Sequence, residues 1–202
     1  MKSRILTVNR EFESAGNEIA QAVAERLGIP YYDRFLITNV AEEMGFDAAT
    51  AEKHDEKPIS RFQLSESQAA FFYTSPSTPA PTGVKIAEAQ FDLIRKIADE
   101  GPCVIVGRCA GYVLHEAQKD VVSIFIHAGV ESRTKRAMQS LKISEAEATK
   151  ILKQTDKGRR IYHHNYTGLE WNDPEQYDMI LNTDKVSFEE CVDLICSLYN
   201  AD

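Results

Sequence analysis

Residues 5–27, ILTVNREFESAGNEIAQAVAERL, decide the fold of this chain. They open with an apolar run at 5–8, which is typical of a buried strand. A loop ending in small residues at 14–16 follows, and residues 19–27 place apolar side chains at helical spacing. A strand, a loop and a helix in this order direct main-chain N–H groups and a helix N-terminus at one point, which suits a phosphate. The pattern therefore indicates either a phosphate site at residues 9–16 or a plain strand-to-helix turn.

This loop lacks the lysine of the complete nucleoside-triphosphate motif G-x-x-x-x-G-K-[ST]. In one register Gly16 stands where the lysine would be, and in the other register Asn17 does. Glu11 and Glu13 would in addition repel a phosphate. The stretch thus predicts the main-chain geometry of a phosphate site without its usual cation.

The composition indicates a cytoplasmic globular protein with one domain. The chain has 202 residues, 43% of them hydrophobic and 27% charged, with a net charge of -8 that argues against a nucleic-acid partner. No apolar run approaches the roughly 20 residues that span a bilayer, and the first residues lead into a strand without a signal sequence. The four cysteines form no C-x-x-C pair, so we expect reduced thiols and no metal site.

Strand and helix patterns alternate along the rest of the chain, which predicts a parallel sheet covered on both faces. Continuous apolar runs at 103–106 and 121–126 are typical of buried parallel strands. We expect a three-layer α/β fold with a five-stranded parallel sheet flanked by helices. The strands are predicted at 5–8, 28–33, 103–106, 121–126 and 179–182, and the helices at 19–27, 35–44, 84–100, 131–138, 144–166 and 188–198. Residues 46–84 are polar and rich in proline near their end, which indicates a loop or subdomain edge.

Two further places carry arginines that suit phosphate. Arg108 follows a predicted buried strand, where open α/β sheets bind ligands, and its planar fork can bind two oxygens at once. The alternative for Arg108 is a carboxylate partner that holds a loop. Arg159 and Arg160 lie within one helical turn of Asp156, as in a helical lid over phosphates, although a solvated charged helix would show the same pattern. The adjacent His163 and His164 are expected at the surface.

Four stretches occur in an order that resembles the cytidylate kinase-like family of P-loop proteins. They read NREFESAGNEIA, LGIPYYDRFLI, GPCVIVGRCAGYVL and TDKGRRIYHHNYTGLEWNDPEQYDMILNT. The resemblance runs from about residue 5 to residue 198 and implies the fold of a nucleoside monophosphate kinase. It makes residues 46–84 a monophosphate-binding insert and residues 144–166 a lid.

The resemblance also implies roles for individual residues. Arg108 would contact the acceptor monophosphate, with Asp156 also on the substrate side, and Arg159 and Arg160 would contact the transferring phosphates. Asp33, at the end of the second predicted strand, is assigned to the substrate site, with capping of the following helix as the favoured alternative. The donor loop would use these residues: Arg10, Ser14, Ala15, Gly16, Asn17 and Glu18. We expect transfer of the ATP γ-phosphoryl group to a nucleoside monophosphate such as CMP, with Mg2+ as cofactor and Arg10 in place of the lysine. No protein residue is assigned as a metal ligand, although Glu18 stands where a Ser/Thr anchor for magnesium would be.

This chain departs from the family pattern at several positions. Glu13 and Ala15 replace two glycines of the loop, Asn17 replaces a basic residue, and Gly111 replaces an aspartate. Cys109 stands where true cytidylate kinases have another aspartate. The alternative interpretation is therefore a non-catalytic protein that keeps the kinase fold and binds a nucleotide or another anion. The expected partner is a phosphate-bearing small molecule, and the helix at 84–100 is a possible homodimer surface.

Overall fold

The computed structural model describes residues 4–33 and 82–201. The predicted helix at 35–44 and residues 46–81 of the predicted insert lie outside these ranges. The described elements are β1 (Ile5–Arg10), α1 (Gly16–Leu27), β2 (Tyr31–Tyr32), α5 (Thr82–Glu100), β3 (Val104–Val106), α6 (Ala110–Glu116), β4 (Val121–His127), α7 (Val130–Leu141), α8 (Glu145–Thr167), the 3-10 helix η1 (Pro174–Gln176), β5 (Met179–Asn182) and α9 (Phe188–Asn200).

The five strands form one parallel sheet in the order β2-β3-β1-β4-β5, which confirms the predicted sheet. In its centre Thr7 of β1 lies level with Ile105 of β3 and Ser123 of β4. The chain leaves β1 toward the β2 edge and leaves β4 toward the β5 edge. Such a reversal opens a crevice at the carboxyl ends of the strands, so the end of β1 is the expected place for a ligand.

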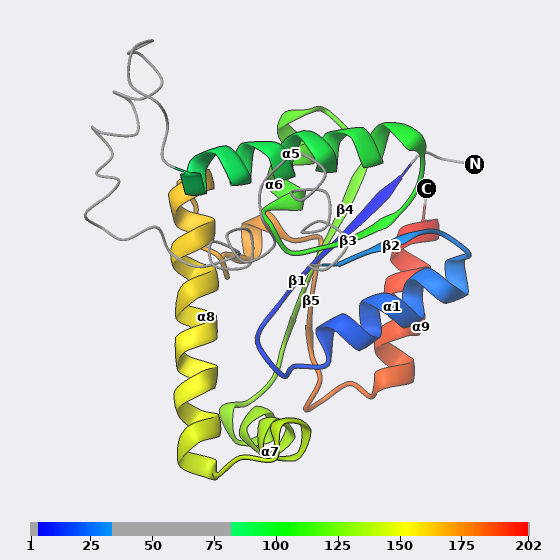
Figure 1. Ribbon diagram of the computed structural model, residues 1–202. Coiled ribbons are helices and arrows are strands. Elements are labelled where there is room, and N and C mark those ends of the chain that lie inside the picture. The colour runs from blue at the N-terminus through cyan, green and yellow to red at the C-terminus, as the bar shows by residue number, and fades with distance from the viewer. Residues whose placement is uncertain (1–3, 34–81, 202) are drawn as a thin grey trace.

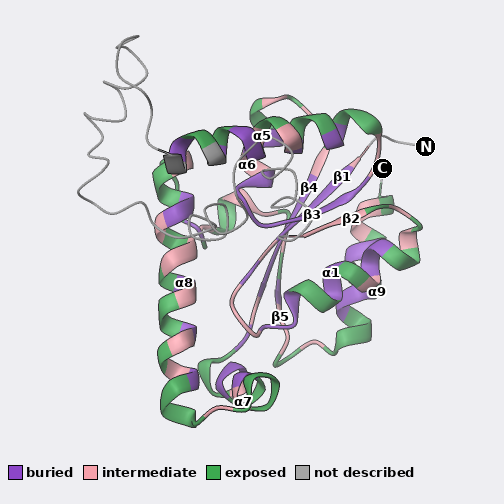
Figure 2. Cartoon of the chain, viewed as in Figure 1, coloured by how far each residue is buried: buried purple, intermediate pink, exposed green. Residues whose placement is uncertain are grey.

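Helices cover both faces of the sheet, and each face has its own apolar core (Figure 1). One core joins α1 and α9 to the sheet through residues such as Ile19, Val23 and Ile195. The other lies under α5 and α6 and includes Ile94 and Leu114. Figure 2 shows the buried residues concentrated on the strands and on the inner faces of these helices. The architecture is the predicted three-layer α/β fold.

The predicted lid is one continuous helix, α8, that extends from α7 to α5 (Figure 1). Ser144 begins it with a capping box, in which its hydroxyl accepts from the Glu147 N–H and the Glu147 carboxylate accepts from the Ser144 N–H. Ala148 and Leu152 pack against Ala137 of α7 in a small third core. The helix therefore occurs where it was predicted, and its role as a lid stays a prediction.

Several details differ from the sequence-based expectations. α5 begins at Thr82, inside the range assigned to the insert, and the seven-residue helix α6 had no predicted counterpart. All four cysteines are free and buried, and burial raises the pKa of the Cys103 thiol to about 12. None of the helices in residues 4–33 and 82–201 is both long and apolar enough to cross a membrane.

Candidate functional site

A pocket of about 290 Å³ lies at the carboxyl end of β1, beside the first turn of α1. Its walls come from the β1–α1 loop (residues 11–15), both flanking elements, the residue after β2 and helix α8. The lining residues are Arg10, Glu11, Phe12, Glu13, Ser14, Ala15, Gly16, Asn17, Glu18, Asp33 and Arg159. The predicted donor-loop residues and Asp33 thus meet in one pocket at the topological switch of the sheet.

The main chain of this loop has the shape of an anion site. Glu13 and Ala15 have φ angles of 58° and 66°, which lie in the left-handed region that favours glycine. The family pattern has glycine at these two positions. The loop of this chain adopts the left-handed backbone there although it carries Glu13 and Ala15 instead. Ala15 is also the N-cap of α1 and provides no side-chain cap. The first N–H groups of α1 have no partner within the helix, and they carry the positive end of its dipole. A phosphate fits such a helix end.

The loop is fixed from behind by two buried side chains of opposite charge. The Phe12 N–H donates to Asp156 Oδ1 at 2.8 Å, and Arg133 Nη1 donates to the Phe12 carbonyl at 3.0 Å. Arg133 Nη1 also donates to Asp156 Oδ2 at 2.6 Å. Both side chains are about 5% exposed. Helices α7 and α8 therefore hold one residue of the loop on both sides of its α-carbon.

Ser14 is also held in the interior, by its side chain. Its hydroxyl donates to the carbonyl oxygens of Glu11 at 2.9 Å and Ile126 at 3.1 Å, while the Thr183 hydroxyl donates to the Ser14 carbonyl at 3.1 Å. These bonds commit the hydroxyl of Ser14 to the protein. The Ser14 N–H also donates to the Glu11 carbonyl at 3.4 Å, so the predicted cofactor contact of Ser14 stays a prediction.

Arg10 lies against the start of α1 and is 5% exposed. A Cβ placed on Gly16 would come within 2.4 Å of Arg10 Cβ, so only glycine lets the two segments approach this closely. Arg10 Nε donates to Asn17 Oδ1 at 2.8 Å. This contact places a cation beside residue 17, where the loop has lost a basic residue. The role of Arg10 as the replacement for the missing cation stays a prediction.

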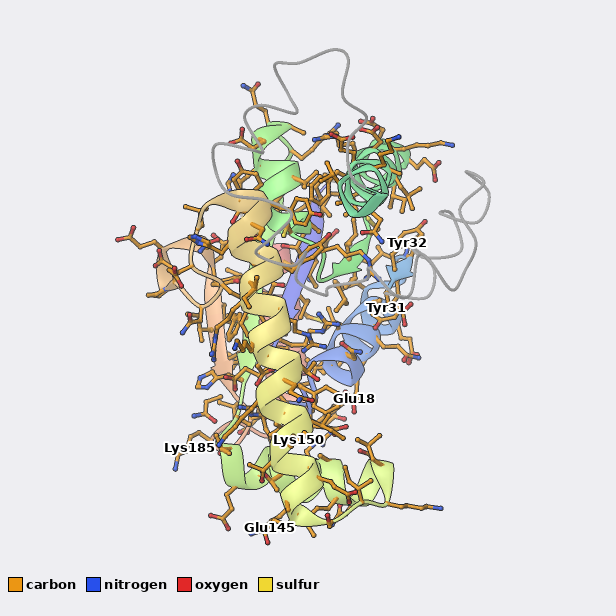
Figure 3. All side chains as sticks on the ribbon, turned by 60° about the vertical axis from the view of Figure 1, so that its left-hand side comes forward. Glu18, Tyr31, Tyr32, Glu145, Lys150 and Lys185 are labelled. Atoms are coloured by element: carbon orange, nitrogen blue, oxygen red, sulfur yellow. The ribbon has the colours of Figure 1, made fainter. Side chains whose placement is uncertain are left out.

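The acidic residues of the loop are partly neutralised by Arg136 of α7. Arg136 Nη2 lies 2.8 Å from Glu18 Oε1, and its Nε lies 3.8 Å from Glu13 Oε2. The Ser140 hydroxyl donates to Glu13 Oε1 at 2.9 Å. Figure 3 shows Glu18 on the first turn of α1, below Tyr31 of β2. The Glu13 carboxylate is thus bound by α7, which reduces the repulsion that the sequence predicted.

A second cavity of about 10 Å³, large enough for roughly one water, adjoins the first. It is lined by Asn9, Arg10, Arg108, Cys109, Arg159, Tyr162, His163 and Trp171. Arg108 is 1% exposed and follows β3 with a φ of 52°. Arg159 Nη1 donates to the Arg10 carbonyl at 2.8 Å. Arg10 and Arg159 line both cavities, so three predicted arginines converge at the end of β1.

Two of the predicted site residues lie apart from these cavity walls in the described structure. Arg160 is exposed on α8 and stacks over the Trp171 ring, with its guanidinium carbon 6.0 Å from the ring centroid. Asp156 lies under the β1–α1 loop with Phe12 and Arg133. Their predicted roles toward phosphate and substrate stay predictions.

His163 is buried at 4% exposure, so the expectation of surface exposure is wrong for this residue and holds for His164. Its Nδ1 lies 3.3 Å from the Leu169 carbonyl oxygen and 3.2 Å from the Thr167 hydroxyl. Burial lowers the pKa of His163 because it disfavours the charged imidazolium. The lining of the smaller cavity therefore includes a histidine that is neutral at pH 7.

Helix α6 approaches the sheet closely at Gly111. A Cβ at this residue would lie 3.0 Å from Ser123 Oγ and 3.2 Å from Thr7 Oγ1. The two hydroxyls are buried and hydrogen-bond to each other at 3.0 Å. The missing side chain at position 111 thus leaves the hydroxyls of Thr7 and Ser123 as partners of each other.

Arg133, Arg136 and Trp171 are among the residues of the site that had no predicted role. Both arginines belong to the predicted helix after the fourth strand and are spaced three residues apart. That spacing places the two arginines at neighbouring positions on one helix face, and it is the one feature of the sequence that could have indicated a shared role. Nothing in the sequence pattern distinguishes them from other charged residues of a surface helix.

A sequence profile of the cytidylate kinase-like family matches residues 5–185. The chain belongs to the cytidylate kinase-like family. A cytidylate kinase of Pyrococcus horikoshii is 34% identical over 92 residues, and the match covers 46% of each chain. The chain thus spans about half the length of this curated relative.

Solved structures support the same fold. An uncharacterized protein from Eubacterium ventriosum is similar with a TM-score of 0.74 and 28% identity, over 98% of this chain and 99% of that chain. A shikimate kinase from Bacteroides thetaiotaomicron has a TM-score of 0.53 and 13% identity, with 98% of each chain covered. A gluconokinase from Sinorhizobium meliloti has a TM-score of 0.54 and 10% identity, over 98% of this chain and 91% of that chain. The last two likenesses concern the fold alone.

Proposed function

We propose that this member of the cytidylate kinase-like family is a nucleotide kinase that transfers the ATP γ-phosphoryl group to a nucleoside monophosphate such as CMP. The observation that carries the proposal is the pocket of about 290 Å³ at the carboxyl end of β1, whose lining includes Arg10 and Arg159, two arginines that also line the small cavity beside Arg108. Phosphoryl transfer between two phosphates depends on holding donor and acceptor together and neutralising their charge. A pocket lined by two arginines at the carboxyl ends of the strands suits that requirement.

Each part of the site has a role in this proposal. The β1–α1 loop and the first turn of α1 bind the donor phosphates, and Arg10 provides the cation that a lysine supplies in the complete motif. Arg108 binds the acceptor phosphate, and Arg159 lies between the two. A contact of Arg160 with the phosphates is proposed from the family resemblance alone, since Arg160 lies on the exposed side of α8 over the Trp171 ring. An acceptor that is itself a phosphate oxygen needs no side chain acting as general base.

Magnesium fits the same pocket by its donor atoms. The carboxylates of Glu18 and Asp33 both line the larger cavity, and magnesium prefers oxygen ligands of this kind. These two residues would hold the ion, which would neutralise charge on the donor phosphates. Glu18 is bound to Arg136 in this structure, so an ion at Glu18 would replace that partner.

A second candidate function follows from Glu13. Its left-handed backbone and its carboxylate beside the pocket favour a non-catalytic protein that binds an anion in a fold inherited from kinases. This candidate predicts that an anion such as CMP binds at Arg108 and that ATP does not bind.

Calorimetric titration of Mg·ATP and, separately, CMP tests the proposal, with the wild type and Arg108→Lys compared. Lysine keeps the charge but cannot bind two oxygens with a planar fork, so CMP binding should weaken by about tenfold or more while ATP binding persists. Arg4→Lys is the matched control, because Arg4 pairs with Asp120 at the opposite end of β1. Binding of CMP without ATP would favour the non-catalytic candidate, and binding of neither would exclude the kinase.

A further inference from the structure

We infer that Arg133 and Asp156 are positioning residues for the donor loop, and that Asp156 serves the donor site rather than the acceptor. The inference rests on the proposed function in taking ATP as the donor. It differs from the family-based expectation, which places Asp156 on the substrate side. The observation behind it is the double contact of these two side chains with Phe12.

The contact sets the orientation of two neighbouring peptide groups. All peptide bonds described are trans, so the C=O and N–H of one peptide point in opposite directions. The carbonyl of Phe12 points to Arg133, and the N–H of Glu13 in the same peptide therefore points away from it. Likewise the Phe12 N–H points to Asp156, and the Glu11 carbonyl points away and accepts the Ser14 hydroxyl. The pair thus directs the Glu13 N–H away from the protein interior, as an anion site requires.

The pair can be tested at Asp156, because Arg133 has a second carboxylate neighbour. Arg133 Nε lies 3.2 Å from Glu11 Oε2, and this carboxylate also accepts from the Ala128 N–H at 3.3 Å. Arg133 therefore keeps an acidic neighbour if Asp156 is neutralised. A substitution at Asp156 removes the contact with Phe12 without leaving an isolated buried cation.

Helix α8 links this contact to the arginines. Asp156 and Arg159 are three residues apart on α8, and they bind the main chain of Phe12 and Arg10, respectively. One face of one helix thus holds the loop at two points. Arg108 belongs to a different segment, between β3 and α6, and has no part in these bonds. Loss of the Asp156 contact should therefore disturb the donor site and spare the acceptor site.

The test compares wild type, Asp156→Ala, Asp156→Asn and Arg133→Met by calorimetry with Mg·ATP and with CMP. We expect Asp156→Ala and Arg133→Met to weaken ATP binding by about tenfold or more, since each loses bonds to a charged group. CMP binding should stay within about twofold, because Asp156 lines neither cavity and its bonds go to Phe12 and Arg133 rather than to Arg108. Asp156→Asn keeps an oxygen that can accept the Phe12 N–H, so its ATP affinity should be intermediate. Asp120→Ala, which breaks the distant pair with Arg4, is the control for loss of an ion pair.

A second readout is independent of nucleotide binding. Amide hydrogen exchange in the ligand-free protein should become faster at residues 11–16 in Asp156→Ala and stay unchanged there in Asp120→Ala. Weakened CMP binding with unchanged ATP binding would overturn the inference and assign Asp156 to the acceptor. Equal losses for both nucleotides, or no loss for either, would overturn it as well. If the wild type binds neither nucleotide, the proposed function fails, and unchanged exchange at residues 11–16 would then overturn the positioning role.

Discussion

The guanidinium of Arg159 donates a hydrogen bond of 2.8 Å to the carbonyl oxygen of Arg10. The two arginines come from α8 and from the end of β1, and they line both cavities of the candidate site. The bond fixes the Arg159 side chain at the end of β1, beside the pocket that the proposed donor would occupy. Such an arrangement favours a ligand that carries concentrated negative charge.

Replacement of Arg159 should weaken both nucleotides. Arg159→Gln removes a charged donor from both cavities, and loss of such a hydrogen bond is worth about 1.5–3 kcal/mol, or roughly ten- to a hundredfold in affinity. Arg95→Gln is the matched control, because Arg95 is exposed on α5, pairs with Asp92 and lines neither cavity. Trp171 is the single tryptophan of the chain and lines the smaller cavity, so its fluorescence can report titrations of ATP and CMP. Equal losses in both variants would contradict the special position of Arg159.

Arg136 should favour anion binding because it neutralises the carboxylates of Glu13 and Glu18 beside the pocket. Arg136→Gln leaves Glu13 and Glu18 beside the pocket without this cation, so the affinity for pyrophosphate should fall by a few-fold to about tenfold. Glu13→Gln removes one of the two carboxylates and should restore part of that affinity in the double variant. Titrations at low and high salt check the electrostatic origin, because screening should reduce the effect. Independent, additive effects of the two changes would argue against the proposed coupling.

Ala15→Gly should stabilise the protein. A left-handed residue other than glycine costs roughly 1–2 kcal/mol, and Ala15 has a φ of 66°. Part of this gain is offset by the buried methyl group and by chain entropy, so we expect a net increase of about 0.5–1 kcal/mol in the free energy of unfolding. Ala20→Gly in the buried middle of α1 is the control and should destabilise by about 1 kcal/mol or more. Urea unfolding measures both, and a destabilised Ala15→Gly would contradict the strain at this residue.

His163 should make the stability fall at mildly acidic pH. Burial holds the pKa of His163 below its ordinary value of 6.5, so the unfolded chain takes up a proton that the folded chain does not. The contribution of His163 is fully present above pH 6.5 and is lost as the pH falls below it, at up to about 1.4 kcal/mol per pH unit. Urea unfolding between pH 5 and 8 should show a weaker pH dependence in His163→Gln. His164→Gln, at the exposed neighbour, should retain the dependence of the wild type, and an unchanged slope in His163→Gln would refute the prediction.

The sequence allowed the sheet and the position of its ligand crevice to be predicted, because both follow from local patterns. Buried parallel strands show as apolar runs at 103–106 and 121–126, and the residue after such a strand points to the crevice, as Arg108 does. Helical spacing similarly placed Arg159 on the helix predicted at 144–166, which is α8. The left-handed backbone at Glu13 and Ala15 was indicated only by the resemblance, since neither residue type signals it.

The remaining features depend on contacts between distant parts of the chain. Arg133 and Phe12 are 121 residues apart, and Arg136 reaches Glu18 across 118 residues, so no local pattern indicates these pairs. His163 became buried because α8 packs along the body of the protein, whereas its neighbour His164 stays exposed. A hydrophobic period identifies a helix face, but it does not specify which polar residue will find a partner on that face.

The close approach at Gly111 constrains three positions that lie far apart in the sequence. The hydroxyls of Thr7 and Ser123 fill the space beside this residue. A side chain at position 111 therefore requires that the hydroxyls shift or that they donate hydrogen bonds to it. An aspartate at 111, the residue expected from the family pattern, would accept from both hydroxyls and leave neither free to bond the other. Residues 7, 111 and 123 should therefore substitute together during evolution, with an acidic group and its two donors gained or lost as a set.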